Sequence, residues 1–461
     1  MAHLVGLRAA VATGAHLSTY RGCWGRAALQ LRHNKVSELF SNRFSSLQLL
    51  DVASLVGYVE SSPLVPLEAK RAFKLFADDI QAVAHQLSLV AKIVTFLAVE
   101  AHMRSHQVLQ QDLDRDATIA ASPLRPPIFI AGLPRTGTTL LHHLLALDPE
   151  SQCLRAFELM RATRPLHGWL PAGIVDFFDW ACLAVAMRIG EVLAPQWPHH
   201  HSLDASSPEE CLFALQRSMP LDTHYRARPR LPSTYVEEKE IPLAAYERYR
   251  SFLQQVQKRR KSEEKRYVLK GQLLHLQYMA QLRSAFPEAK VIWSHRPVEQ
   301  VVGSLCSLRR SQQEVFLRDP PDKAEVGRGV LKYLADALER ARDALKDEKC
   351  KESLIHVRYE SLVEDPVAVV EQIYAAWGWQ VSEAHRQAME RYLEQSLSQR
   401  SRAEGGRSRY HDASLASYGL TEHAVRRHFR QVDFGRDAFE GSQAVVRHSE
   451  LLARSRKPQL P

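Results

Sequence analysis

One string of residues combines the features needed to bind a phosphate group. It reads Gly132-Leu-Pro-Arg-Thr-Gly-Thr-Thr139 and follows the apolar run Ile128-Phe-Ile-Ala131. Backbone N–H groups at the start of a helix point at an anion, and the helix dipole favours its negative charge. Two glycines, Gly132 and Gly137, allow the backbone to approach a ligand closely. Further hydrogen-bond donors are the hydroxyl groups of Thr136, Thr138 and Thr139.

The nearest motif by spacing is the nucleotide-triphosphatase loop, GxxxxGK[ST]. In this chain Thr138 occupies the lysine position, and the basic residue is Arg135, two positions before Gly137. The lysine that would reach the β- and γ-phosphates is therefore missing, which disfavours ATP or GTP hydrolysis. The string instead resembles the 5′-phosphosulfate loop of sulfotransferases, where Lys or Arg, then Ser or Thr, precedes Gly-Thr-Thr. The alternative is an ordinary turn between a strand and a helix.

This resemblance implies a second anion site, because the sulfate donor 3′-phosphoadenosine 5′-phosphosulfate also carries a 3′-phosphate. The string Val291-Ile-Trp-Ser-His-Arg-Pro297 places Arg296 at the end of an apolar run, and Ser304 follows eight residues later. Arginine makes a forked, permanently charged contact to phosphate, and serine adds a hydroxyl donor. The spacing is similar to the 3′-phosphate motif of sulfotransferases. Pro297 is expected at the first helical position.

A third part of the donor site is implied by Tyr359-Glu-Ser-Leu-Val-Glu-Asp-Pro366. Sulfotransferases often carry Tyr-Glu-x-Leu-x-x-Asp-Pro here, with the tyrosine near the adenine, on which an aromatic ring can stack. The alternative for Tyr359 is a core position at a strand end. The resemblance covers about residues 125–380 and is closest to the tyrosylprotein sulfotransferases and the bacterial-type sulfotransferase group.

The resemblance also implies catalytic residues. Sulfuryl transfer to a hydroxyl group needs a base for the acceptor proton and cations for the developing charge. Glu158 lies where tyrosylprotein sulfotransferases place their catalytic glutamate, with a solvated helix position as the alternative. Lys270 is expected to contact the sulfuryl group, although Gly271-Gln272 follows it in place of the usual Asp-Pro or Ser-Pro. Arg135 would neutralise the leaving group.

His275 is the second candidate for the base, because histidine suits that role at neutral pH. Its alternative is a helical position facing the sheet. No metal is required if Arg and Lys supply the positive charge. His199-His-His201 cannot all face one ion, so we expect a surface or acceptor-pocket role for them. A basic flap over the 3′-phosphate, or else a solvated loop, is expected around Gly405-Gly406, which are flanked by Arg400, Arg402, Arg407 and Arg409.

Strand-like runs that alternate with helical patterns must position these residues. Besides 128–131, they occur at 267–269, 291–294 and 354–357, and Asp365-Pro366 is a typical helix start. Such alternation predicts an α/β fold, a P-loop-type parallel sheet flanked by helices, with an added helical N-terminal region. We predict a basic arm or transit segment at 1–37 and a helical region at 38–120. The sulfotransferase domain should occupy 125–395, with a mostly helical insertion at about 160–265. A basic loop and helical tail should follow at 396–461.

Composition sets broader limits. Lys plus Arg total 61 and Asp plus Glu 52, a net charge of +9 that suits an anionic ligand but does not argue for nucleic acid. The six cysteines lack CxxC spacing, which favours a reducing compartment. No run reaches the about 18 apolar residues that a membrane span needs. We expect a cytoplasmic protein, or a mitochondrial or plastid one if the acid-free N-terminal segment is a transit peptide.

The predicted function is transfer of a sulfuryl group from 3′-phosphoadenosine 5′-phosphosulfate to a hydroxyl group, with a small molecule as the expected acceptor. Two alternatives stay open: a catalytically silent nucleotide-binding protein on the same fold, and a nucleotide kinase, against which Thr138 argues.

Overall fold

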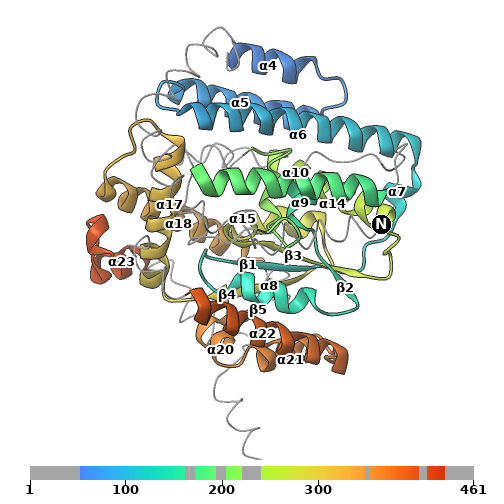
Figure 1. The fold of residues 1–461 in the computed structure, drawn as a ribbon, viewed down its shortest axis with the longest axis vertical. Coiled ribbons are helices and arrows are strands. Elements are labelled where there is room, and N and C mark those ends of the chain that lie inside the picture. The colour runs from blue at the N-terminus through green and yellow to red at the C-terminus, as the bar shows by residue number, and fades with distance from the viewer. Residues whose placement is uncertain are drawn as a thin grey trace, which may run out of the picture.

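The computed structural model describes residues 52–160, 166, 172–193, 204–220, 240–347, 354–403 and 413–430. At its centre is a five-stranded parallel sheet with the strand order β2-β3-β1-β4-β5 (Figure 1). The strands are β1 Ile128–Gly132, β2 Ser151–Gln152, β3 Arg266–Gly271, β4 Lys290–His295 and β5 Leu354–Arg358. All four predicted strands are confirmed. The two-residue edge strand β2 was not predicted, because it is too short to carry a hydrophobic pattern.

Apolar residues of the four longer strands divide between two different hydrophobic cores, as expected for a sheet that is covered on both faces. On β1, Phe129 packs into one core and Ile130 into the other. The first core is completed by α14 Glu240–Arg260, α15 Gln272–Gln277, α16 Met279–Ala285, α17 Val298–Phe316 and α18 Lys323–Ala344. The second is completed by α8 Thr138–Ala146, α20 Tyr359–Glu364, α21 Pro366–Ala376 and α22 Glu383–Ala403.

The N-terminal helices form an additional layer at the top of Figure 1. They are α4 Val52–Ser61, α5 Leu67–Val83 and α6 Leu89–Arg115, followed by the short α7 Thr118–Ala121, which contacts α14. Their shared core includes Phe316 and Leu317 at the end of α17. The Ser88 hydroxyl, which caps α6, also donates to the Val315 carbonyl at 2.8 Å. The layer is therefore packed directly onto the α/β body.

The remaining elements lie around the sheet: α9 Ala156–Met160, α10 Ala172–Leu193, α12 Leu212–Leu215, a 3-10 turn Ala416–Tyr418, and α23 Glu422–Phe429. Among the described ranges, every helix falls short of the length or apolar character that crossing a bilayer demands. Helix α21 begins as predicted, with Pro366 as its first residue and the Asp365 carboxylate accepting from the Ala368 N–H at 3.0 Å. Pro297 differs slightly from prediction, because it precedes α17, which begins at Val298.

Candidate active site

The predicted phosphate loop joins β1 to α8, at the carboxyl edge of the sheet. Gly137 immediately precedes α8 with φ of +83°, a left-handed conformation that favours glycine. A Cβ atom at this position would lie 2.9 Å from Leu362 Cδ2 and 3.1 Å from Tyr359 Cδ2. Both the backbone angle and this close packing therefore require glycine. The first turn of α8 is oriented by contacts to the segment that follows β5.

Three of the predicted donor-binding residues meet beside this loop. The Arg135 Nε donates to the Ser304 hydroxyl at 3.1 Å, and the Arg296 Nη1 donates to the Arg135 carbonyl at 3.0 Å. Burial, and secondarily the positive charge of Arg296, lower the pKa of Arg135. Two guanidinium groups that lie this close together form a site suited to an anion.

Tyr359 completes this group at the start of α20. The Arg296 guanidinium lies over the Tyr359 ring, 4.2 Å from its centroid, in a cation–π contact. The same ring packs against Gly137. The tertiary structure thus brings together the loop, the Arg296–Ser304 motif and the predicted adenine-contacting tyrosine, which lie on three different strand-to-helix connections.

The three loop threonines differ in their surroundings. The Thr136 hydroxyl is buried and donates to the Leu133 carbonyl at 2.8 Å, while the Ser294 hydroxyl donates to the Thr136 carbonyl. Thr136 therefore uses its side chain to shape the loop. The Thr138 side chain is also buried, whereas Thr139 is exposed and faces Lys270.

Lys270 lies at the end of β3, next to Ile130 of β1 in the sheet register. Its Nζ donates to the Thr139 hydroxyl at 3.2 Å. The same Nζ lies 3.2 Å from Glu210 Oε1 and 4.0 Å from Glu209 Oε1. The predicted sulfuryl-contacting lysine is thus directly linked to the phosphate loop and to two carboxylates.

Glu209 and Glu210 are the residues that sequence reasoning missed. Glu210 forms a parallel bridge with Lys270, and its Oε1 accepts a hydrogen bond of 2.5 Å from the Gln272 amide. Gln272 has φ of +42°, an angle that proline cannot adopt. The unusual Gly271-Gln272 pair therefore orients a carboxylate beside Lys270. The only sequence signal was two adjacent acidic residues after Pro208.

His275 lies in the core, on the helix α15 that follows Gly271. Its ring is fully buried, packs edge-on against Phe129 with centroids 5.0 Å apart, and has Nδ1 2.8 Å from the Tyr246 hydroxyl. Burial lowers the pKa of His275 to about 3. The ring also lies directly against Gly271. These contacts match the alternative of a helical histidine facing the sheet.

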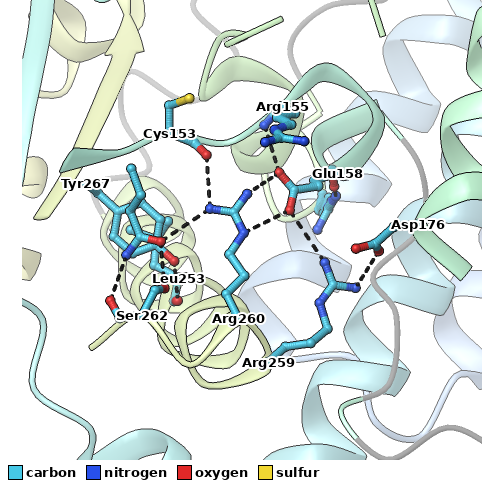
Figure 2. A network of polar contacts seen from close by, with 11 residues as sticks. Cys153, Arg155, Glu158, Asp176, Leu253, Arg259, Arg260, Ser262 and Tyr267 are labelled. Carbon is cyan, nitrogen blue, oxygen red and sulfur yellow. Dashed lines mark hydrogen bonds and ion pairs between the residues drawn. The ribbon is translucent and has the colours of Figure 1, made fainter. Parts of the chain in front are cut away.

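Glu158 lies on α9 in a network of charged groups (Figure 2). Arg260 donates to both of its carboxylate oxygens, from Nε at 3.2 Å and from Nη2 in a close contact. Arg259 lies 3.5 Å from Oε1 on the other side and bridges to Asp176 of α10. Figure 2 shows the Glu158 carboxylate pointing into this arginine pair.

Two predicted clusters lie outside the described residues: His199–His201 and the arginines around Gly405-Gly406, of which Arg400 and Arg402 have only their backbone described in α22. In the part of the chain that the structure describes, no group of three His, Cys, Asp or Glu side chains is placed to bind a metal.

The family model of the sulfotransferase family matches residues 126–383, more than half of the chain. This chain belongs to the sulfotransferase family. Two curated relatives, from Mycobacterium bovis and Mycobacterium tuberculosis, are named omega-hydroxy-beta-dihydromenaquinone-9 sulfotransferase Stf3. Each is 26% identical over 276 residues, which span 58% of this chain and 66% of the relative, slightly under two thirds of its length.

Solved structures confirm the fold of this sulfotransferase. STF1 from Mycobacterium tuberculosis H37Rv superposes with a TM-score of 0.62 and 24% identity, covering 83% of this chain and 99% of that one. STF9 from Mycobacterium avium gives a TM-score of 0.64 and 22% identity, covering 82% and 94%. The predicted α/β class and the predicted family are both confirmed.

Proposed function

We propose that this sulfotransferase transfers a sulfuryl group from 3′-phosphoadenosine 5′-phosphosulfate to a hydroxyl group of a small molecule. The observation that carries this proposal is the meeting of Arg135, Arg296 and Ser304 beside a helix N-terminus, with the Tyr359 ring next to Arg296. Two anion sites and one aromatic ring suit a nucleotide that bears both a 5′- and a 3′-phosphate.

In the proposed reaction the acceptor oxygen attacks sulfur and the bond from sulfur to the 5′-phosphate oxygen breaks. Adenosine 3′,5′-bisphosphate then leaves. Lys270 and Arg135 stabilise the charge on the sulfuryl group and the leaving oxygen. We propose Glu210 as the base that receives the acceptor proton, because its carboxylate lies beside Lys270 and makes its contacts to Lys270 and Gln272 through the same oxygen, Oε1. Glu158 stays the candidate that the family resemblance suggests.

Calorimetric binding of adenosine 3′,5′-bisphosphate tests the donor site. We expect Arg135→Ala and Arg296→Ala each to weaken binding about 10–100-fold, since a hydrogen bond to a charged group contributes about 1.5–3 kcal/mol. Arg188→Ala is the control, because this exposed residue pairs only with Glu191 on α10 among the contacts described. If both site variants bind as tightly as the unaltered protein, the donor site is misassigned.

The base is tested by turnover with donor binding measured in parallel. Glu210→Gln should retain nucleotide binding and lose about 10²–10⁴-fold in kcat, the usual contribution of a general base.

For acceptors, we propose hydroxylated small molecules that include isoprenoid quinones, because the relatives named above act on a hydroxylated menaquinone. A panel of such quinones, simple phenols and alcohols with labelled donor would identify the class, and no labelled product from any of them would contradict this acceptor assignment.

A further inference from the structure

The Glu158 carboxylate has a different set of contacts from the one expected of a proton acceptor. Only 5% of its side chain is exposed, and Arg260 donates to both of its oxygens (Figure 2). Arg259 approaches Oε1 at 3.5 Å, and the Arg155 N–H donates to Oε2 at 2.9 Å. Hydrogen bonds of this kind fix a carboxylate in place and occupy the lone pairs that an acceptor hydroxyl would need.

The same network holds the backbone that precedes α9. Arg260 Nη1 donates to the Cys153 carbonyl at 3.1 Å, and the Arg155 N–H is held by Glu158 itself. Arg217 adds bonds of 3.0 and 2.9 Å to the carbonyls of Glu158 and Leu159. Residues 153–159 are therefore held by charged side chains from two elements, Arg260 of α14 and Arg217, which follows α12.

This fixed segment pairs with the chain that leads to Glu209 and Glu210. Three backbone bonds join the two: Ala156 N–H to the Ser207 carbonyl at 3.0 Å, Phe157 N–H to the Ala205 carbonyl at 3.1 Å, and Glu209 N–H to the Leu154 carbonyl at 3.1 Å. Immediately beyond, the Cys211 N–H donates to the Lys270 carbonyl at 2.7 Å. Hydrogen bonds, joined by short stretches of backbone, thus connect Arg260 to the segment that carries the carboxylates beside Lys270.

We propose that Glu158 and Arg260 form a positioning pair, which holds residues 205–211 so that the Glu209 and Glu210 carboxylates face Lys270. Glu158 is then a positioning residue that acts through the backbone of residues 154–157. This inference rests on the function proposed above, in which Glu210 and Lys270 act on the reacting groups. Under this proposal Glu158, the glutamate that the family resemblance suggests as the base, does not accept the proton.

Hydrogen exchange followed by mass spectrometry tests the pair in the full-length protein without requiring turnover. Glu158→Gln and Arg260→Gln should each speed exchange of the amides in residues 205–211, and the double variant should add little to either single variant. Arg260→Lys keeps the charge and should restore part of the protection. Arg188→Gln, which breaks a surface ion pair on α10, is the matched control and should leave these amides unchanged.

Turnover gives a second, independent comparison. A positioning role predicts that both single variants lose kcat to a similar extent, about 10–100-fold, because small displacements of reacting groups have effects of this size. The affinity for adenosine 3′,5′-bisphosphate should stay within about twofold, and the acid limb of the kcat–pH profile should be kept. Loss of that limb in Glu158→Gln, with Arg260→Gln near normal, would overturn the proposal and assign the base to Glu158.

Unchanged exchange of residues 205–211 in both glutamine variants would also overturn it, whatever the activity. A failure of the proposed function appears differently. In that case the unaltered protein would not bind the nucleotide or would yield no labelled product, while the exchange results would still report on the pair.

Discussion

Gly271 accounts for the departure of this chain from the Lys-Asp-Pro and Lys-Ser-Pro strings of the enzymes that it resembles. A Cβ atom at this position would lie 2.3 Å from the His275 Nε2, and that ring is held between Phe129 and Tyr246. The ring cannot move aside without disturbing the core. The buried His275 ring therefore requires glycine at position 271. The next residue, Gln272, donates a hydrogen bond to Glu210.

We accordingly expect Gly271→Ala to lower the free energy of unfolding by about 1–3 kcal/mol, the usual cost of overpacking a core. Gly57→Ala is the control, because a Cβ atom there meets nothing within 4 Å and α4 should gain up to about 1 kcal/mol. Urea denaturation measures both values. Equal stability of Gly271→Ala and the unaltered protein would show that the His275 ring can relocate.

Tyr359 allows a second prediction for a single residue. Tyr359→Ala removes the ring below Arg296, and we expect it to weaken binding of adenosine 3′,5′-bisphosphate about 3–20-fold, since a cation–π contact contributes about 0.5–2 kcal/mol. Tyr359→Phe keeps the ring and should stay close to the unaltered protein in calorimetry. If alanine binds as well as phenylalanine, the ring has no part in holding Arg296 or the nucleotide.

At the scale of elements, the sheet register decides which loops meet. Gly132 of β1 is paired with Ser294 of β4, and Ile130 with Lys270 of β3, so the carboxyl ends of three neighbouring strands coincide. The phosphate loop, Arg296 and Lys270 extend from these ends. Parallel sheets with helices on both faces generally place their ligands at this edge, where neighbouring connections diverge.

Helix α21 gives a test of how the predicted elements are stabilised. Asp365→Ala removes the cap on the Ala368 N–H and should reduce the free energy of unfolding by about 1 kcal/mol. Asp365→Asn should differ little, because asparagine caps helices about as well as aspartate. Thermal denaturation of the two variants checks this. A similar loss in both would indicate that the charge of Asp365, and not its capping bond, stabilises the helix.

At the scale of the whole molecule, the structure buries several histidines in its two main cores and under the N-terminal layer. His106 lies on α6 with its Nε2 2.8 Å from the Arg217 carbonyl, and the half-buried His102 lies on α6 beside Phe73. His142 lies on α8 and His275 on α15. Burial lowers the pKa of each of them to about 3, and nearby cations contribute further for the first three. These side chains are therefore neutral in the folded protein.

This burial predicts sensitivity to acid. The folded-state pKa values lie below the unfolded value of 6.5, so the unfolded chain binds more protons between pH 6.5 and about pH 3. The full stability is present above pH 6.5 and is lost as the pH falls, by about 1.4 kcal/mol per pH unit for each such histidine. Urea titrations across this range measure the slope. His102→Leu should reduce this slope by about 1.4 kcal/mol per pH unit, the contribution of one histidine. An unchanged slope would contradict the prediction.

The sequence by itself determined the features that depend on neighbours in the chain. The strand and the helix on either side of the glycine loop, the other three longer strands and the Asp365 cap were predicted correctly, because each is a local pattern of glycine, apolar or capping residues. The predicted family was recognisable for the same reason, because its motifs are short strings.

Only the tertiary structure decided which carboxylates lie beside Lys270. Glu158 and Arg260 are 102 residues apart, and Glu210 and Gln272 are 62 apart, with no motif linking either pair. Such contacts depend on how α9, α14 and the 204–211 segment pack, which no local pattern specifies. Acidic residues near a binding loop are equally compatible with catalysis, with an ion pair or with solvent, and their partners in space distinguish these roles.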